Sequence, residues 1–291
     1  MVKIKIMRFD KIVIVGSGKI ACDIVGLLSK EIFLTNLVVI ESKRNSLSFL
    51  EKICIRKGVR YIYLLDTDKL EKCLKIETLN NQSVLIISAN NQHIFSKELL
   101  INSKFEVINF HYSYLPNYRG MNIPTWVIYN QEPYTGITWH YVTEIIDAGE
   151  IIARKKIFLT DDITAFDVTR LGMKLGIETF KEFVFDLLEE HIDGIKINEG
   201  ELGTFYSNNK LPENGYLKLN ESCANIYKIL RCYDYGKGNI LLPLTVAYKD
   251  REYYVKHYEK ISNDCTSNES INDIVIKGNE FSLKITIAEK K

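Results

Sequence analysis

The sequence predicts an α/β protein in which a Rossmann-like, mostly parallel sheet with helices on both faces precedes a small, β-rich, barrel-like C-terminal domain. Over the first half of the chain, short β-branched runs alternate with segments of helical spacing, as in a parallel sheet covered by helices. After residue 214 the runs become short and strand-like. The 291 residues suffice for about two domains, and we expect these over residues 1–203 and 204–291.

The strands of the first domain are predicted from apolar, β-branched runs. The run at 11–15 (KIVIV) is the first of them, and the run at 83–88 (SVLIIS) has the apolar character of a strand buried on both faces. The run at 106–110 leads directly into His111. The expected strands are 11–15, 37–41, 60–64, 83–88, 106–110, 136–143 and 151–158.

Helices are predicted where apolar residues recur every three or four positions. The long segment 163–191 predicts one such helix, with a break near Gly172 or Gly176 because glycine disfavours a helix interior. The other expected helices are 18–29, 46–57, 70–76, 96–101 and 125–130, and a linker is expected over 193–214. In the second domain we expect a helix over 221–234 and strands over 245–248, 252–258, 274–276 and 281–287.

Composition and charge exclude several classes of protein. With 46% hydrophobic and 26% charged residues the chain is an ordinary globular protein, and 38 basic against 37 acidic residues leave a net charge of +1. No global field therefore draws it to nucleic acid or to an anionic membrane. The six cysteines form no C-x-x-C pair, which predicts neither a disulfide framework nor a zinc site. Since the apolar run Ile12–Val15 is too short for a signal peptide and no apolar stretch reaches membrane-spanning length, we expect a cytoplasmic protein.

A glycine-rich turn follows the first expected strand. Residues Gly16 to Ala21 have the pattern G-x-G-x-x-A, and Glu41 stands at the end of the second expected strand. Such a turn lets the backbone approach a pyrophosphate at a helix N-terminus, and an acidic residue at this distance can bind a ribose. A dinucleotide site and a plain strand-to-helix turn both fit this pattern.

Asn109 and His111 form a more specific candidate site. Because side chains alternate along a strand, these two should project from one face and Phe110 from the other. Ligands bind at the carboxyl ends of strands in open parallel sheets, and an amide beside an imidazole there can stabilise a developing oxyanion. The structural alternatives are an asparagine that caps a loop and a histidine that binds carbonyls.

Two downstream features strengthen this candidate. Thr138-Trp139-His140 lies on the next expected strand, and Asp147 lies in a glycine-bounded turn from which its carboxylate can return to face His111. Such a contact would favour the imidazolium and fix its tautomer. Because no serine or cysteine stands nearby in an activating motif, we expect direct transfer between bound substrates. The nearest hydroxyl, Ser113, is expected to cap the loop.

The motifs N-x-H, L-P-x-Y-R-G, T-x-H and D-x-G, in this order, resemble those of formyltransferases that use 10-formyltetrahydrofolate. They span Asn109 to Gly120 and Gly136 to Ile152, and the resemblance covers roughly residues 84–190. The family is methionyl-tRNA formyltransferase-like, and it includes sugar and aminoacyl N-formyltransferases. The resemblance implies an enzyme of one-carbon metabolism with its catalytic domain over residues 1–203.

The resemblance also implies the site residues. Asn109, His111 and Asp147 would be catalytic, polarising the formyl carbonyl and relaying the proton of the attacking amine. The 10-formyltetrahydrofolate co-substrate would lie between two segments, and no metal is implied. The expected folate-binding residues are Ser88, Ala89, Asn90, Asn91, Gln92, Ile94, Val142, Thr143 and Ile145. On this resemblance the glycine turn at Gly16 need not bind a dinucleotide and could instead contact a phosphate of the acceptor; whether it does so stays open.

The sequence departs from the tRNA-specific members of the family. Arg119-Gly120 continues Met-Asn-Ile-Pro-Thr-Trp where those enzymes have R-G-A-A-P, the region after Glu41 is short, and the C-terminal domain is nearly neutral. These departures favour a small-molecule or carrier-bound amine, such as an amino sugar nucleotide or an aminoacyl carrier, over aminoacyl-tRNA, with no membrane partner; the oligomeric state stays open. Two alternatives also stay open, a 10-formyltetrahydrofolate hydrolase and a Rossmann-type dinucleotide-binding protein.

Overall fold

The computed structural model describes residues 7–42, 48–78, 82–237, 240–263 and 272–290. Its backbone contacts divide the chain into two compact units, each built from separate segments. The sheet unit consists of residues 1–119, 136–157 and 171–205, and the C-terminal unit consists of residues 120–135, 158–170 and 206–291. Two segments that precede residue 204 in the sequence therefore belong to the C-terminal unit.

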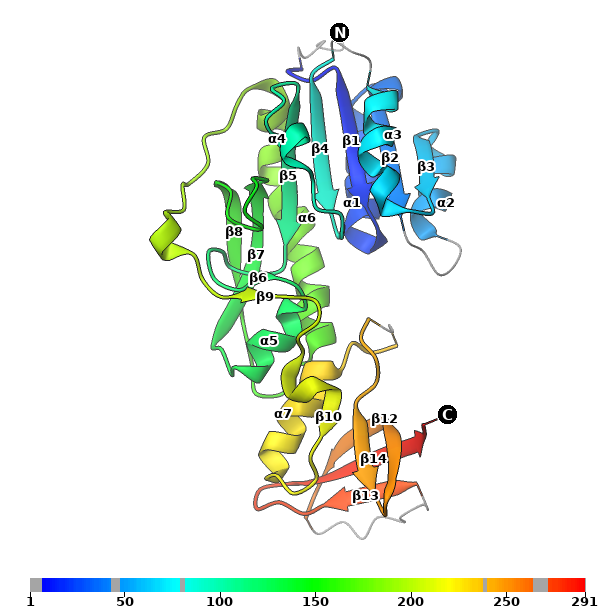
Figure 1. Cartoon of the computed structure of the whole chain (residues 1–291), viewed down its shortest axis with the longest axis vertical. Helices are drawn as coiled ribbons and strands as arrows, with labels where there is room; N and C mark the ends of the chain where they lie inside the picture. Colours follow the sequence, from blue (N-terminus) through cyan, green and yellow to red (C-terminus); the bar gives the residue numbers. More distant parts are fainter. Residues whose placement is uncertain (1–6, 43–47, 79–81, 238–239, 264–271, 291) are drawn as a thin grey trace. The chain divides into compact units, whose positions relative to one another are not determined.

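A seven-stranded sheet with the order β3-β2-β1-β4-β5-β7-β8 forms the framework of the first half (Figure 1). The first five strands of this order pair in parallel, and β7 pairs antiparallel to β5. The mostly parallel, Rossmann-like sheet predicted from the β-branched runs is confirmed. Its strands are β1 (Lys11–Gly16), β2 (Leu37–Ser42), β3 (Arg60–Leu64), β4 (Val84–Ala89), β5 (Phe105–His111), β7 (Tyr134–Tyr141) and β8 (Ile151–Phe158).

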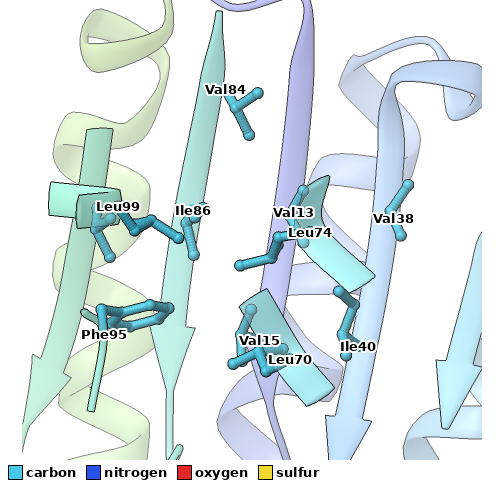
Figure 2. Packing of buried hydrophobic residues seen from close by; sticks show 11 residues of the cluster. Val13, Val15, Val38, Ile40, Leu70, Leu74, Val84, Ile86, Phe95 and Leu99 are labelled. Carbon is cyan, nitrogen blue, oxygen red and sulfur yellow. The ribbon is translucent and has the colours of Figure 1, made fainter. Parts of the chain in front are cut away.

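Helices cover both faces of this sheet, as Figure 1 shows. On one face, Leu70 and Leu74 of α3 and Leu99 of α4 pack with Phe95 over the strands (Figure 2). Val13, Val38, Ile86 and their neighbours supply the strand side of this core. The helices α1 and α6 lie on the opposite face. The helices up to this point are α1 (Gly18–Glu31), α2 (Phe49–Lys57), α3 (Leu70–Glu77), α4 (Lys97–Leu100), α5 (Ile123–Tyr129) and α6 (Ala165–Glu189).

Three expectations about elements are corrected. The helix α6 runs unbroken through Gly172 and Gly176. Both glycines lie where an aromatic ring packs directly on the helix backbone: a Cβ at Gly172 would lie 2.9 Å from Tyr112, and one at Gly176 would lie 2.4 Å from Phe110. The expected linker over 193–214 contains β9 (Phe205–Tyr206), which pairs with β6 (Arg119–Gly120). The helix expected over 46–57 begins at Phe49, where Ser48 caps it, and residues 46–47 lie outside the described residues.

The C-terminal unit is β-rich, as predicted. Its five-stranded sheet has the order β10-β11-β12-β14-β13, with β10 and β13 at its two edges. Helix α7 (Cys223–Tyr233) packs Ile226 and Leu230 against this sheet, with Val246 and Ile285 on the sheet side. Thr125 of α5, fully buried, donates to the Cys232 carbonyl at 2.9 Å and shares a hydrogen bond with Tyr235. The strands are β10 (Tyr216–Leu217), β11 (Thr245–Tyr248), β12 (Arg251–Ile261), β13 (Asp273–Ile276) and β14 (Ser282–Glu289).

Candidate active site

The predicted catalytic residues gather at the carboxyl ends of β4 and β5. These strands pair in parallel, with Ser88 opposite Asn109 and Ala89 opposite Phe110. On its other side β5 pairs antiparallel with β7, which sets Asn109 opposite His140. Two polar side chains from neighbouring strands therefore meet at this end of the sheet, where ligands bind in open α/β folds.

The face of β5 that does not carry Asn109 and His111 is packed with aromatic rings. Phe110 contacts Tyr112 and Trp139, with ring centroids 4.7 and 5.3 Å apart. The indole of Trp139 is fully buried and donates to the Gly176 carbonyl at 2.9 Å. This packing fixes β5, and with it the direction in which Asn109 and His111 project.

His111 is oriented by the loop that follows it. The ring is almost fully buried, and its Nε2 donates to the Tyr118 carbonyl at 2.8 Å. A carbonyl only accepts, so this bond keeps a proton on Nε2. The other ring nitrogen, Nδ1, then faces Asp147 Oδ2 at 3.5 Å. The imidazole and the carboxylate are thus placed to share a second proton.

His140 joins Asn109 to Asp147. Its Nδ1 donates to the Tyr141 carbonyl at 2.8 Å, so in the neutral ring Nε2 is an acceptor. Nε2 accepts from Asn109 Nδ2 at 3.2 Å, and it lies 3.4 Å from Asp147 Oδ1, to which it donates only in the protonated ring. This contact directs the amide nitrogen of Asn109 toward the cluster, and the amide carries a second N–H donor. The sequence predicts His140 on this strand but does not place it among the catalytic residues. Only the register of β7 against β5, which sets His140 opposite Asn109, shows that it joins them.

Asp147 is held in a turn with a strained backbone. Its φ of 52° lies in the left-handed region, which costs a residue with a side chain about 1 kcal/mol or more. Gly149 makes the turn possible, because a Cβ there would lie 1.8 Å from the Tyr141 carbonyl oxygen. The Asp147 carboxylate is 8% exposed. The turn therefore places a buried carboxylate beside both His111 and His140. The sequence predicted the contact with His111.

The loop between His111 and Arg119 is fastened to β7. Thr138, fully buried, donates to the Ser113 carbonyl at 2.7 Å and accepts from the Leu115 N–H at 3.1 Å. Ser113 itself donates to the Asn117 carbonyl at 2.8 Å, which is the loop-capping role predicted for it. These bonds hold in place the loop that returns to the His111 ring.

The predicted folate-binding residues occupy two neighbouring segments. Val142 packs on the core cluster that contains Phe95, and Lys97 pairs with Glu144 at 3.0 Å, so the two segments lie side by side. Ser88 and Ala89 have buried side chains and can offer a ligand only backbone atoms. The side chains that reach solvent are Asn90, Gln92, Ile94, Thr143 and Ile145, while Asn91 and Val142 are half-buried. The exposed Ile94, Ile145 and Ile146 give the two segments apolar surface, which suits a flat aromatic ligand.

Glu71 anchors the first of these segments. Its carboxylate accepts from the Ser96 N–H and Oγ–H, both at 2.6 Å, and lies 3.3 Å from His93 Nε2. Burial alone would raise the pKa of Glu71, but the hydrogen bonds from Ser96 and His93 outweigh it and hold this pKa below its usual range. The carboxylate therefore stays ionised and ties the segment to α3.

The glycine turn after β1 has partners within the protein. A Cβ at Gly16 would lie 1.9 Å from the Ala89 carbonyl oxygen, so the close approach of β1 and β4 itself requires glycine there. Ser17 Oγ donates to the Asn90 carbonyl at 3.2 Å. Glu41 is 4% exposed and accepts from the Tyr61 hydroxyl at 2.7 Å. These contacts give the motif a structural explanation.

The described residues hold neither a metal-binding cluster nor a membrane-spanning helix. Across those residues, no group of three or more His, Cys, Asp or Glu side chains has the arrangement to hold a metal ion. Within the same part of the chain, no helix combines the length and apolar character needed to cross a membrane.

Two curated relatives match between half and two thirds of the chain. The methionyl-tRNA formyltransferase of Clostridioides difficile is 32% identical over 148 residues, which are 51% of this chain and 47% of that protein. The methionyl-tRNA formyltransferase of Clostridium acetobutylicum is 24% identical over 190 residues, 65% of this chain and 60% of that protein. The chain thus spans about half of the first relative's length and less than two thirds of the second's.

Solved structures match nearly all of the fold. The crystal structure of WlaRD, a sugar 3N-formyl transferase in the presence of dTDP and 5-N-formyl-THF, aligns with a TM-score of 0.71 and 20% identity, covering 98% of this chain and 100% of that one. The N-formyltransferase of Helicobacter canadensis in complex with folinic acid and dTDP-3-aminofucose aligns with a TM-score of 0.70 and 20% identity, covering 96% and 99%. These likenesses establish the fold.

The formyl transferase family model matches residues 23–183, more than half of the chain. That range contains Asn109, His111, His140 and Asp147. It also contains β7 and the Asp147 turn, the elements that bring these side chains together. The protein therefore belongs to the formyl transferase family.

Proposed function

We propose that this protein transfers the formyl group of 10-formyltetrahydrofolate to a primary amine. The observation that carries the proposal is the buried chain of contacts from Asn109 through His140 and Asp147 to His111. An amide donor and a histidine–carboxylate pair at one point are the groups that acyl transfer to an amine requires. Membership of the formyl transferase family supports the reaction, and relatives solved with folate derivatives support the donor.

In the proposed reaction the amine nitrogen attacks the formyl carbon. A C–N bond forms and the carbonyl oxygen becomes an oxyanion, which accepts from the second N–H of Asn109. The positive charge that His111 gains with the proton of the amine also offsets the oxyanion. A donor of the Asn109 kind is worth about 3 kcal/mol of barrier. The proton lost by the amine passes to the His111–Asp147 pair, directly or through a water. When the bond between the formyl carbon and the folate nitrogen breaks, the His111–Asp147 pair gives this proton to that nitrogen, and the formyl group stays on the acceptor amine.

The two segments beside the cluster are proposed to bind the donor. The exposed Ile94, Ile145 and Ile146 offer apolar surface for the pterin ring, and the backbone groups of residues 88–92 offer hydrogen bonds to its edge. The Glu71 carboxylate keeps the first segment in place through Ser96. Because both segments flank the end of β5, a bound donor would present its formyl group to Asn109.

For the acceptor we propose an amine on a nucleotide-linked amino sugar or on a carrier-bound aminoacyl group. The net charge of +1 and the short region after Glu41 offer little to grip a tRNA acceptor stem. Two crystal structures that match almost the whole chain, a sugar 3N-formyl transferase with dTDP and an N-formyltransferase with dTDP-3-aminofucose, support a nucleotide-linked amino sugar.

A spectrophotometric assay of tetrahydrofolate formation from 10-formyltetrahydrofolate tests the proposal. It is run without acceptor and then with nucleotide-linked amino sugars, carrier-bound amino acids and initiator methionyl-tRNA. We expect release that depends on one of the first two acceptor classes. Equal release without any acceptor would instead establish a hydrolase, and dependence on the tRNA would overturn the acceptor assignment.

Site variants test the roles of the residues in the same assay. Asn109→Ala and His111→Ala should each lower turnover at least about a hundredfold at saturating donor while the protein stays folded. His257→Ala, on the exposed side of β12, is the matched control and should keep wild-type turnover. Wild-type rates in either site variant would refute the assigned roles.

A further inference from the structure

In the loop after β5, one residue contacts His111 and the next contacts the peptide group that precedes Asp147. The Tyr118 carbonyl accepts from His111 Nε2 at 2.8 Å. The guanidinium of the next residue, Arg119, donates through Nη1 to the Ile146 carbonyl at 3.1 Å. That carbonyl belongs to the peptide group between Ile146 and Asp147.

The His111 contact depends on an unusual backbone conformation at Tyr118. Its φ of 59° lies in the left-handed region, which side-chain-bearing residues seldom adopt. In this conformation its carbonyl faces the imidazole, and Nδ1 is left to face Asp147. The loop therefore selects which ring nitrogen meets the carboxylate.

The Asp147 turn has an exposed apex. Ile145 and Ile146 on either side of its apex are 47% and 37% exposed, so side-chain packing contributes little there. The turn closes through the Ala148 N–H bond to the Ile145 carbonyl at 3.2 Å. Arg119 holds the peptide group between Ile146 and Asp147. Asp147 has a positive φ, so the orientation of this peptide group determines where the Asp147 carboxylate points.

Arg119 has a firm second anchor. Its Nε donates to the Gly203 carbonyl at 3.3 Å and its backbone N–H to the Thr204 carbonyl at 3.0 Å. Gly203 in turn donates to the Pro116 carbonyl at 3.1 Å, and a Cβ at Gly203 would lie 2.7 Å from Asn117 Cα. The planar guanidinium thus spans a tightly packed segment and the exposed turn, a two-point contact that a lysine cannot reproduce.

We propose that Tyr118 and Arg119 act as one positioning device, in which the Tyr118 carbonyl sets the His111 ring and the Arg119 guanidinium sets the Asp147 carboxylate. Arg119 touches neither reacting atom, so it is a positioning residue and not a catalytic one. The role rests on the proposed function, in which His111 and Asp147 share the proton of the amine. A displacement of about 1 Å between such groups can cost up to a hundredfold in rate.

The first test is steady-state kinetics of Arg119→Ala and Arg119→Lys, with Arg60→Ala as control. Arg60 is an arginine of the edge strand β3 that pairs with Glu77. We expect kcat to fall about tenfold to a hundredfold in both Arg119 variants, with the KM of each substrate within about twofold of wild type. Methylguanidinium should partly restore kcat in Arg119→Ala only. An unchanged kcat, or a loss confined to KM, would overturn the proposal.

The second test needs no turnover, so it separates this proposal from the proposed function. The ¹⁵N NMR shifts of the His111 ring, assigned with His111→Gln, report which nitrogen carries a proton. We expect a proton on Nε2 and an Nδ1 signal that senses Asp147 in the wild type and in Arg60→Ala. In Arg119→Lys the Nδ1 signal should move toward that of an Asp147→Asn variant. Identical His111 shifts in wild type and Arg119→Lys would overturn the positioning role, whereas a wild-type protein with no transferase activity would overturn only the function.

Discussion

Alanine at Gly176 should destabilise the protein, although it replaces a glycine inside a helix. A Cβ there would lie 2.4 Å from Phe110 Cε2 and 2.7 Å from its Cζ, where ordinary contact begins at 3.4 Å. The Phe110 ring would have to retreat by about 1 Å, but it is 4% exposed and lies against Trp139 and Tyr112. The new methyl group therefore has no room in the existing packing.

The magnitude follows from two opposing terms. Exchanging glycine for alanine in a helix interior contributes about 1 kcal/mol in favour of the folded state. Overpacking a well-filled core costs about 1–3 kcal/mol, and a 1 Å displacement of a confined ring belongs to the upper part of that range. We expect Gly176→Ala to lose about 1–2 kcal/mol of unfolding free energy on balance.

Gly26 provides the matched control. It lies inside α1, and a Cβ built there meets nothing within 4 Å. Gly26→Ala should therefore gain about 0.5–1 kcal/mol. The measurement is equilibrium urea unfolding of both variants, followed by circular dichroism, together with turnover in the formyl transfer assay. Turnover should fall in Gly176→Ala alone, because Phe110 lies between Asn109 and His111. Equal stabilisation of both variants would refute the packing argument.

Three further predictions concern side chains around the site. His140→Gln should lower kcat about tenfold with little change in the donor KM, because Asn109 loses its orienting acceptor; wild-type kcat would contradict this. Thr138→Val should cost about 1–3 kcal/mol in urea unfolding, because two main-chain groups lose their buried partner; an unchanged midpoint would refute it. The pKa of Glu71 is lowered in the folded state, so its contribution to stability is present above the unfolded-state pKa and is lost as pH falls through the folded-state value. The stability gap between wild type and Glu71→Gln should therefore narrow on acidification, and a gap that widens would contradict this sign.

The parts of the fold that depend on local pattern could be predicted from the sequence. The β-branched run at 11–15 forms β1, and the apolar run at 83–88 forms β4 with one residue shifted at each end. The alternation along β5 correctly separated Asn109 and His111 from Phe110, because side-chain direction in a strand depends only on position. Asp147 was placed near His111 by the glycine-bounded turn, and the structure brings the two within 3.5 Å.

The parts that depend on tertiary contacts could not be predicted. His140 enters the cluster only through the register of β7 against β5, which residue types do not encode. The break expected in α6 is absent because the glycine that weakens a helix also admits the Phe110 ring, a benefit visible only in the packed structure. The roles proposed for Tyr118 and Arg119 rest on a main-chain carbonyl and on bonds to main-chain carbonyls. The L-P-x-Y-R-G motif contains both residues, but residue types alone do not report contacts of that kind.

The interleaving of the two units limits how this chain could be divided or recombined. The C-terminal unit includes α5 and residues 158–170, which the sequence places before much of the sheet unit. A cut at residue 203 would leave α5 without α7 and would expose Thr125, whose hydroxyl bonds to Cys232 and Tyr235. The C-terminal unit is therefore not one continuous segment of the sequence. An exchange of this unit between relatives would have to transfer residues 120–135, 158–170 and 206–291 together.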